Sequence, residues 1–168
     1  SKKGYYVIRM GSEVQDAMLT YDPKIIELDI DGYRTELLDI YLSANCKFFI
    51  NGESGLGGVP RIFRRPLIMV NIAPLEYILS WASNIISIPK KLWLIKEKRI
   101  MSFNEIYKSG AGRFLRTDQY EKMGIELIEN TPDEILDVSM EMHRRLNGTW
   151  EITEEDESLQ KFFWNQFP

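Results

Sequence analysis

A glycine-rich run at residues 51–60 carries the residue types best suited to binding chemistry in this chain. It follows the apolar segment 47–51, which predicts a buried strand, and a short helix is expected to begin in it and end near Arg64. Glycines let the backbone approach a ligand closely, and free N–H groups at a helix start attract phosphate. Ser54 could add a hydroxyl contact. The alternative is a tight strand-to-helix turn without a ligand, because the spacing matches neither Gly-x-Gly-x-x-Gly nor the P-loop.

A second candidate turn follows the first predicted strand, at residues 5–10. Gly11 and Ser12 form the turn, and Arg9 stands just before it. If the sheet is parallel, this turn lies at the same edge as the glycine-rich run. An arginine at that edge could pair with a phosphate through two hydrogen bonds. Alternatively, Arg9 is a surface residue bonded to a nearby carboxylate.

A third candidate turn follows the second predicted strand, at residues 24–28. The strand is followed by Asp29 and Ile30 and then by Asp31 and Gly32, which indicate a loop. Backbone groups of this loop, or the Asp29 carboxylate, could contact a base or a ribose. Alternatively, the segment is a solvated turn.

The elements that would position these three turns alternate between strands and helices. A helix is expected at 35–44 and a fourth strand at 67–70. Connections are short, and the strands lack polar alternation. This pattern is typical of a parallel sheet covered on both faces, where ligands bind at the carboxyl ends of the strands.

The second half of the chain predicts shorter elements and two helices. The expected segments are a strand at 85–88, helical turns at 102–108 and 118–123, a strand at 126–128, and an amphipathic helix at 154–167. Thr131, Pro132 and Glu134 mark the start of a helix that should run to Asn147 and stop at Gly148. We therefore predict an α/β, three-layer Rossmann-like domain with a mainly parallel sheet at 1–150, and a C-terminal helical segment at 151–168.

Composition excludes several classes of protein. With 168 residues, 44% hydrophobic and 27% charged, the chain can form a core and is not intrinsically disordered. Its formal charge of −4 lacks the basic excess that binding to nucleic acid requires. One cysteine, Cys46, and one histidine, His143, exclude a disulfide framework and make a metal site unexpected.

The distribution of apolar residues predicts no membrane span and no signal peptide. Cys46 lies in an apolar run and is expected to be a small core residue. These features favour a reducing compartment. The predicted location is the cytoplasm, and the inner face of the membrane is an alternative within it.

Seven runs of the sequence carry a more specific signal; they are 5–12, 38–42, 46–50, 54–56, 63–66, 89–93 and 124–132. On these runs the chain resembles a bacterial family of glycosyltransferases linked to surface-polysaccharide genes. The block 28–71 is also distantly similar to the C-terminal half of heptosyltransferases, which have the GT-B fold. In that fold two Rossmann-like halves enclose a cleft, and the C-terminal half holds the nucleotide-diphosphate sugar. The chain differs from heptosyltransferases in having Glu53 in place of Asp, and Gly57-Gly58 where a His often stands.

The resemblance implies that Ser54, Gly55 and Leu56 bind the donor diphosphate, that Asp29 and Ile30 lie near the base or the ribose, and that Gly11 and Ser12 line the cleft. The position of the two turns at one sheet edge adds Arg9 and Gly57 to the residues expected at the diphosphate. Glu53 is expected near the base, the ribose or the cleft. The resemblance also implies an N-terminal half that supplies the acceptor site and the general base.

The predicted function is that of the donor-binding domain of a glycosyltransferase. It would move a sugar from a nucleotide-diphosphate donor to a glycan or lipid-linked acceptor, with no cofactor and no metal. The alternative is a non-catalytic scaffold domain that binds a nucleotide or phosphate. A flavodoxin-like phosphate-binding module is a third possibility, and bound flavin would colour it yellow.

Overall fold

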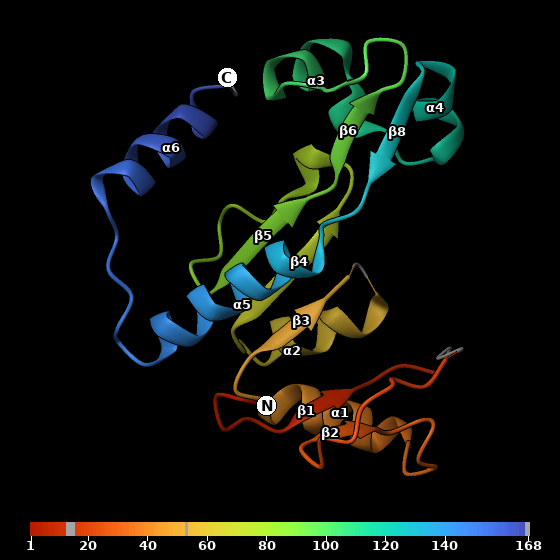
Figure 1. Ribbon diagram of the computed structural model, residues 1–168, viewed down its shortest axis with the longest axis vertical. Helices are drawn as coiled ribbons and strands as arrows, with labels where there is room; N and C mark the ends of the chain where they lie inside the picture. Colours follow the sequence, from red (N-terminus) through yellow and green to blue (C-terminus); the bar gives the residue numbers. More distant parts are fainter. Residues whose placement is uncertain (13–15, 53, 167–168) are drawn as a thin grey trace.

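The computed structural model describes residues 1–12, 16–52 and 54–166, and its first half is built on parallel strands (Figure 1). β1 (Val7–Arg9) pairs with β2 (Ile25–Glu27). β3 (Phe49–Asn51), β4 (Leu67–Ile72) and β5 (Ile85–Pro89) form a second sheet in that order. Both sheets are parallel, which confirms the α/β class and the parallel pairing of these strands. Among the described residues no hydrogen-bonded ladder joins β1 to β3, so these strands form two sheets.

Helices connect these strands and cover them. α1 (Glu36–Asn45) joins β2 to β3, while the short helices η1 (Gly55–Gly57) and α2 (Gly58–Ile62) join β3 to β4. α5 (Pro132–Leu146) lies across β4 and β5, where Met142 packs in a buried cluster with Ile68 and Val70 (Figure 1). Successive residues Leu67 and Ile68 are both 0% exposed. Because neighbouring side chains of a strand point to opposite faces, β4 is covered on both sides.

A third sheet corrects the prediction of a mainly parallel sheet. β6 (Lys91–Leu94) lies between β7 (Arg99–Ile100) and β8 (Ile125–Ile128), and both pairings are antiparallel. The sequence analysis predicted neither β6 nor β7. The reason is the turn between them: it contains no glycine or asparagine, and Lys98 adopts the left-handed conformation at φ 53°. Such a turn lacks the residues that usually mark a hairpin.

The remaining helices surround this antiparallel sheet. They are η2 (Leu75–Tyr77), α3 (Phe103–Ser109), η3 (Ala111–Arg113), α4 (Thr117–Lys122) and α6 (Glu154–Trp164). α6 rests on α3 through a perpendicular ring contact of 4.9 Å between Phe163 and Phe103. The predicted end of this helix, Phe167, lies outside the described residues. No helix in the described ranges combines the length and the apolar composition needed to cross a bilayer.

Candidate functional site

A cavity of about 1440 Å³ lies between β1 and β3, and we call it the interstrand cavity. Every residue from 5 to 12 and from 45 to 52 borders it. Side chains on one face of a strand belong to alternate residues. Because consecutive residues line the cavity, each strand turns its edge, and not one of its faces, towards the cavity. α1 and α5 provide the other two walls. The cavity therefore occupies the place where β1 and β3 would otherwise pair.

Six of the predicted site residues border the interstrand cavity. They come from two loops that are far apart in the sequence: Arg9, Gly11 and Ser12 from the first, and Ser54, Gly55 and Leu56 from the second. No described residue accepts a hydrogen bond from the N–H group of Gly55 or Leu56. The structure thus brings the first and second candidate turns to one cavity, although the strands before them belong to separate sheets.

The structure does not bring the third candidate turn to this cavity. Asp29 and Ile30 are absent from its described lining. Their loop closes on itself, because the N–H groups of Tyr33 and Arg34 both donate to the Leu28 carbonyl at 3.0 Å. These local bonds hold the loop at the end of β2, on the far side of β1 from β3. Glu53, the remaining predicted cleft residue, lies outside the described residues.

Gly57 is buried beneath the side chain of Asn51 and does not line the cavity. A Cβ atom on Gly57 would lie 2.3 Å from Asn51 Nδ2, so a larger residue at this position requires the Asn51 side chain or the loop to move. The Ser54 hydroxyl donates to Asn51 Oδ1 at 2.7 Å. Its proton is therefore engaged, which leaves only its lone pairs for a ligand. The sequence analysis included Asn51 in the glycine-rich run but gave it no role of its own, although a polar residue at the end of an apolar strand marks such a position.

Arg9 borders the cavity but is engaged with Glu27, its neighbour across the β1–β2 pair. Its Nη1 donates to Glu27 Oε1 at 2.7 Å and to the Asp16 carbonyl at 2.6 Å. The second carboxylate oxygen of Glu27 accepts from the Met18 amide at 2.8 Å. Arg9 Nε and Nη2 donate to no described residue and are the groups left to bind an anion.

Aromatic contacts border the cavity near the start of β1. Tyr5 Oη lies 2.8 Å from His143 Nδ1, and the Tyr5 ring packs perpendicular to Phe48 at 5.6 Å. These contacts tie the start of β1 to α5 and to the segment that precedes β3. The sequence analysis gave His143 no role beyond a helix residue, because its partner is 138 positions away in the chain.

Cys46 also borders the cavity and is only half-buried. Burial raises the pKa of its thiol, an effect that nearby Arg65 opposes. Its Sγ donates to the Ser43 carbonyl at 3.2 Å. The raised pKa keeps the thiol protonated, so Cys46 is unsuited to act as a nucleophile.

Charge distinguishes the interstrand cavity from the rest of the chain. The chain carries a formal charge of −4. The described lining nevertheless contains Lys2, Lys3, Arg9, Arg34 and Lys47 against a single carboxylate, Asp39. Within the described ranges no three potential metal ligands lie close enough to hold an ion. The cavity therefore offers cations and backbone N–H groups, which suit an anionic ligand.

Comparison of the chain with family models, with curated proteins and with solved structures finds no match. The assignment of a function therefore depends on the interstrand cavity and its residues.

Proposed function

We propose that the chain is the donor-binding domain of a glycosyltransferase, with a nucleotide-diphosphate sugar in the interstrand cavity. The observation that carries this proposal is the charge of the cavity. Five lysine and arginine residues and one carboxylate line its described wall in a chain whose formal charge is −4. Its volume of about 1440 Å³ also leaves room for a ligand of this size. The finer architecture proposed is a Rossmann-like half of a GT-B-like enzyme that acts in the cytoplasm.

In this proposal the diphosphate lies between the two loops that border the cavity. The free N–H groups of Gly55 and Leu56 face it from one side, and the free guanidinium donors of Arg9 face it from the other. During transfer, the bond between the sugar and the diphosphate breaks and a bond to the acceptor hydroxyl forms. The same donors would stabilise the charge that develops on the departing diphosphate.

The proposal assigns the general base to another part of the enzyme, the N-terminal half that also binds the glycan or lipid-linked acceptor. Among the described residues that line the cavity, Asp39 is the one carboxylate, and it is paired with Arg34 at 2.9 Å. The same observation favours the alternative function, a scaffold that binds a nucleotide or phosphate without catalysis. An assay for release of sugar from the donor in the presence of an acceptor separates the two functions: a transferase releases the sugar, and a scaffold does not.

Calorimetry with UDP, GDP and CMP tests the proposal. We expect one of them to bind the wild-type chain and Gly55→Trp to abolish that binding, because Gly55 faces open space at the cavity. The matched control is Lys108→Trp, at an exposed position of α3 away from the cavity, which should bind normally. Binding by none of the three nucleotides, or equal binding to both variants, would contradict the proposal.

A further inference from the structure

The edge of β1 that faces the interstrand cavity carries backbone groups without a protein partner. The Val7 N–H donates to the Lys24 carbonyl of the neighbouring segment at 2.8 Å. The Arg9 carbonyl accepts from the Leu28 N–H at 3.2 Å. Because alternate residues of a strand bond to the same neighbouring strand, Ile8 directs its N–H and C=O groups away from β2. No described residue bonds to either group of Ile8.

The edge of β3 is open in the same way on the other side of the cavity. The Phe49 N–H donates to the Pro66 carbonyl at 2.9 Å, and Asn51 is in register with β4. Ile50 lies between them and therefore directs its N–H and C=O groups away from β4. Neither group bonds to a residue that the structure describes. Both Ile8 and Ile50 border the cavity.

The outer edge of β2, on the side away from β1, is by contrast closed by its own loops. The Ile25 N–H donates to the Asp22 carbonyl at 3.0 Å. The Glu27 N–H donates to Asp31 Oδ2 at 3.2 Å, and the Glu27 carbonyl accepts from the Asp31 N–H at 2.9 Å. Proteins protect strand edges in this manner because an open edge pairs with a further strand. Among the described residues, the edges of β1 and β3 have no such protection.

Unpaired backbone groups at a strand edge fit another extended backbone. An extended peptide carries N–H and C=O groups along both of its sides, at the repeat of the edges themselves. The other two walls of the cavity include apolar residues of both helices: Leu42 and Cys46 of α1, and Leu136 and Met140 of α5. A strand with helices on both faces carries apolar side chains on both. The centre of a peptide that fits here is therefore apolar.

The charge of the cavity specifies one end of such a peptide. Lys2 and Lys3 precede β1, and Lys47 precedes β3, so cations gather at the amino ends of both edges. All three lysines are exposed. Within the described ranges none of them forms an ion pair with a carboxylate. Acidic residues beside the apolar centre would complement these charges.

We propose that the interstrand cavity binds an extended peptide segment of a partner protein, which adds a strand to the open edges of β1 and β3. The segment has an apolar centre and acidic residues at the end that meets Lys2, Lys3 and Lys47. This inference does not rest on the proposed function. The groups assigned to a nucleotide lie in or beside the loops that follow the two strands, whereas the peptide pairs with the strands themselves.

Selection of phage-displayed random nonapeptides on the wild-type chain is the first test. We expect enriched peptides to have an apolar centre and an acidic end. Calorimetry then compares each enriched peptide with two synthetic forms, in which one or the other set of alternate amides is N-methylated. Methylation keeps the side chains but removes the donors of one peptide edge, so both forms should bind about tenfold more weakly. Enrichment of no peptide, or equal affinity of the methylated forms, would overturn the inference.

Amide hydrogen exchange of the wild-type chain locates the bound peptide. The Ile8 and Ile50 amides should exchange fast in the free chain and slowly with the peptide bound. The Val7 and Phe49 amides are the controls, because they are already bonded within their sheets. Slow exchange of Ile8 and Ile50 in the free chain would show that β1 pairs directly with β3. Fast exchange with the peptide bound would place the peptide elsewhere, and either result refutes the inference.

Ile8→Pro and Ile50→Pro remove the same donors from the protein. Neither N–H bonds to a neighbouring strand, so proline should preserve the β1–β2 and β3–β4 pairs. Each variant should bind the peptide about fivefold more weakly, the effect of one lost hydrogen bond. The controls Ile8→Val and Ile50→Val keep the N–H group and should bind like the wild type. Unchanged peptide binding by both proline variants would contradict the pairing.

Nucleotide binding distinguishes the failure of this inference from the failure of the proposed function. If UDP, GDP or CMP binds and no peptide does, this inference alone is wrong. If a peptide binds at these edges and none of the three nucleotides binds, the proposed function alone is wrong.

Discussion

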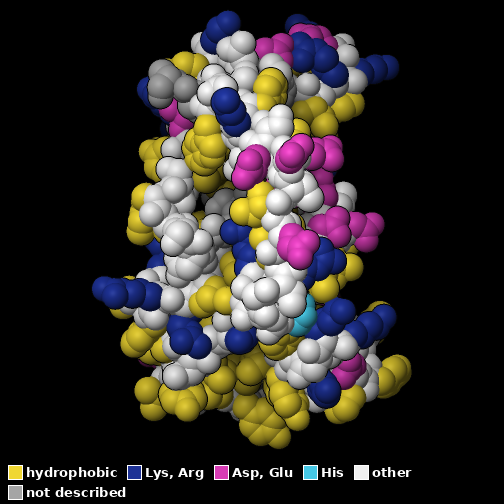
Figure 2. Space-filling view, turned by 90° about the vertical axis from the view of Figure 1, so that its left-hand side faces the viewer, with side chains coloured by type: hydrophobic (Ala, Val, Ile, Leu, Met, Phe, Trp, Pro, Cys, Tyr) yellow, Lys and Arg dark blue, Asp and Glu magenta, His cyan; other side chains and the backbone are white. Residues whose placement is uncertain are grey.

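Two parts of the molecule use their side chains in opposite ways. In the part made of β6, β7, β8, η2, α3, η3 and α4, here the core unit, hydrophobic residues form one buried cluster; it comprises Leu75, Leu92, Met101, Ile106, Ala111, Tyr120 and Ile125. In the part made of β1, β2 and α1, here the cavity unit, most of the buried residues are polar; they are Glu27, Leu28, Asp39 and Ser43. Hydrophobic side chains of the cavity unit lie on the surface instead, at the lower end of the molecule in Figure 2.

This difference indicates that one unit provides most of the stability of the chain and that the other provides its binding surface. Burial of apolar area is the main favourable contribution to folding, and the core unit concentrates it. The cavity unit instead depends on ion pairs such as Arg9–Glu27 and Arg34–Asp39, whose net contribution to stability is small. Arg9, Arg34 and Asp39, three members of these ion pairs, border a large cavity. We infer that the core unit stabilises the chain and the cavity unit binds.

The largest expected effect on the free energy of unfolding comes from placing the same substitution, isoleucine to alanine, in each of the two units. Ile125 is 2% exposed in the core unit, and Ile40 is 47% exposed in the cavity unit. Ile125→Ala should lower the free energy of unfolding by about 2–5 kcal/mol, because it removes buried area and leaves a cavity. Ile40→Ala should change it by less than about 0.5 kcal/mol. Urea denaturation measures both, and equal costs would remove the distinction between the units.

The next effect concerns the loop that joins the cavity to the central sheet. Gly57→Ala would place a Cβ atom 2.3 Å from Asn51 Nδ2, so either the loop shifts or the Asn51 side chain moves and loses its hydrogen bond from Ser54, at a cost of about 1–3 kcal/mol. The neighbouring Gly58 has a helical backbone and open space around it. Gly58→Ala should stabilise the chain by about 0.4–1 kcal/mol. Thermal unfolding of this pair checks the prediction, which fails if both substitutions shift the melting temperature in the same direction.

A smaller effect distinguishes α5, which borders the cavity, from α6, which has no buried residue. Thr131 and Thr153 begin these helices with the same kind of capping box. Thr131→Ala should cost about 1 kcal/mol of global stability. Thr153→Ala should leave global stability unchanged and only increase amide exchange within α6, because a helix without buried side chains can unfold locally. A global loss from Thr153→Ala would show that α6 belongs to the cooperative core.

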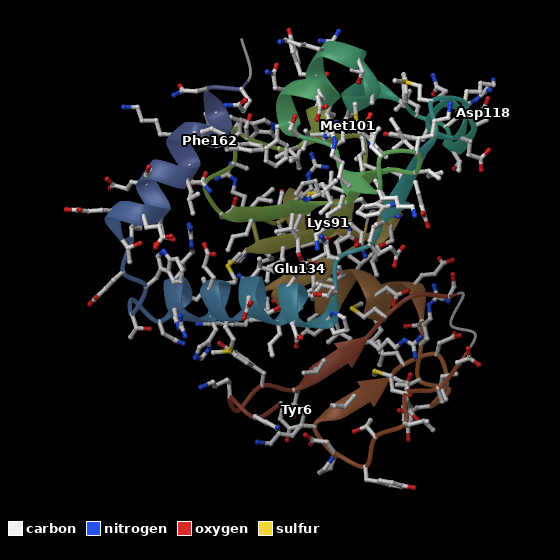
Figure 3. The ribbon with its side chains drawn as sticks, turned by 45° about the horizontal axis from the view of Figure 1, so that its top comes forward. Tyr6, Lys91, Met101, Asp118, Glu134 and Phe162 are labelled. Carbon is white, nitrogen blue, oxygen red and sulfur yellow. The ribbon has the colours of Figure 1, made fainter. Side chains whose placement is uncertain are left out.

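The smallest effect concerns the ion pair between β6 of the core unit and α5. In Figure 3 the labelled Lys91 and Glu134 lie beside each other, and their charged groups are 2.5 Å apart. The hydrogen bond from Lys91, together with the Thr131 cap, lowers the pKa of Glu134 from its usual 4.5. The stabilisation is therefore complete above pH 4.5 and is lost as the pH falls through the lowered pKa of the folded state.

Glu134→Gln tests this pair, because glutamine preserves the capping box but carries no charge. At pH 7 the variant should be less stable than the wild type by under about 1 kcal/mol, since the pair is partly exposed. The difference should vanish in acid, below the folded pKa of Glu134. Urea midpoints measured across this pH range check the sign, and a difference that persists in acid would assign the effect to packing.

Local signals made several elements predictable. The capping box at Thr131 and Glu134 and the stop at Gly148 are confirmed, because Thr131 Oγ1 accepts from the Glu134 amide at 3.2 Å and Gly148 has φ 68°. These bonds join residues that are neighbours in the chain, so residue types suffice to foresee them. The apolar run of β4 similarly predicted a buried parallel strand. The run of β3 predicted a parallel strand too, but the expectation that this strand is buried was wrong, because Ile50 is 45% exposed. The β6–β7 hairpin was not predictable, because Lys98 adopts an unusual backbone angle without a glycine.

By itself, the sequence determined which segments are strands and helices in most of the first half, because these elements follow from local residue patterns. It proposed three turns as candidates for a ligand, and only the tertiary structure showed that two of them border one cavity. Only the tertiary structure decided that Arg9 is engaged by Glu27, that Asn51 covers Gly57, and that Asp39 borders the same cavity as Gly55. The physical reason is that each of these contacts depends on how strands pair and helices pack. Such contacts join residues whose separation in the sequence says nothing about their distance in space.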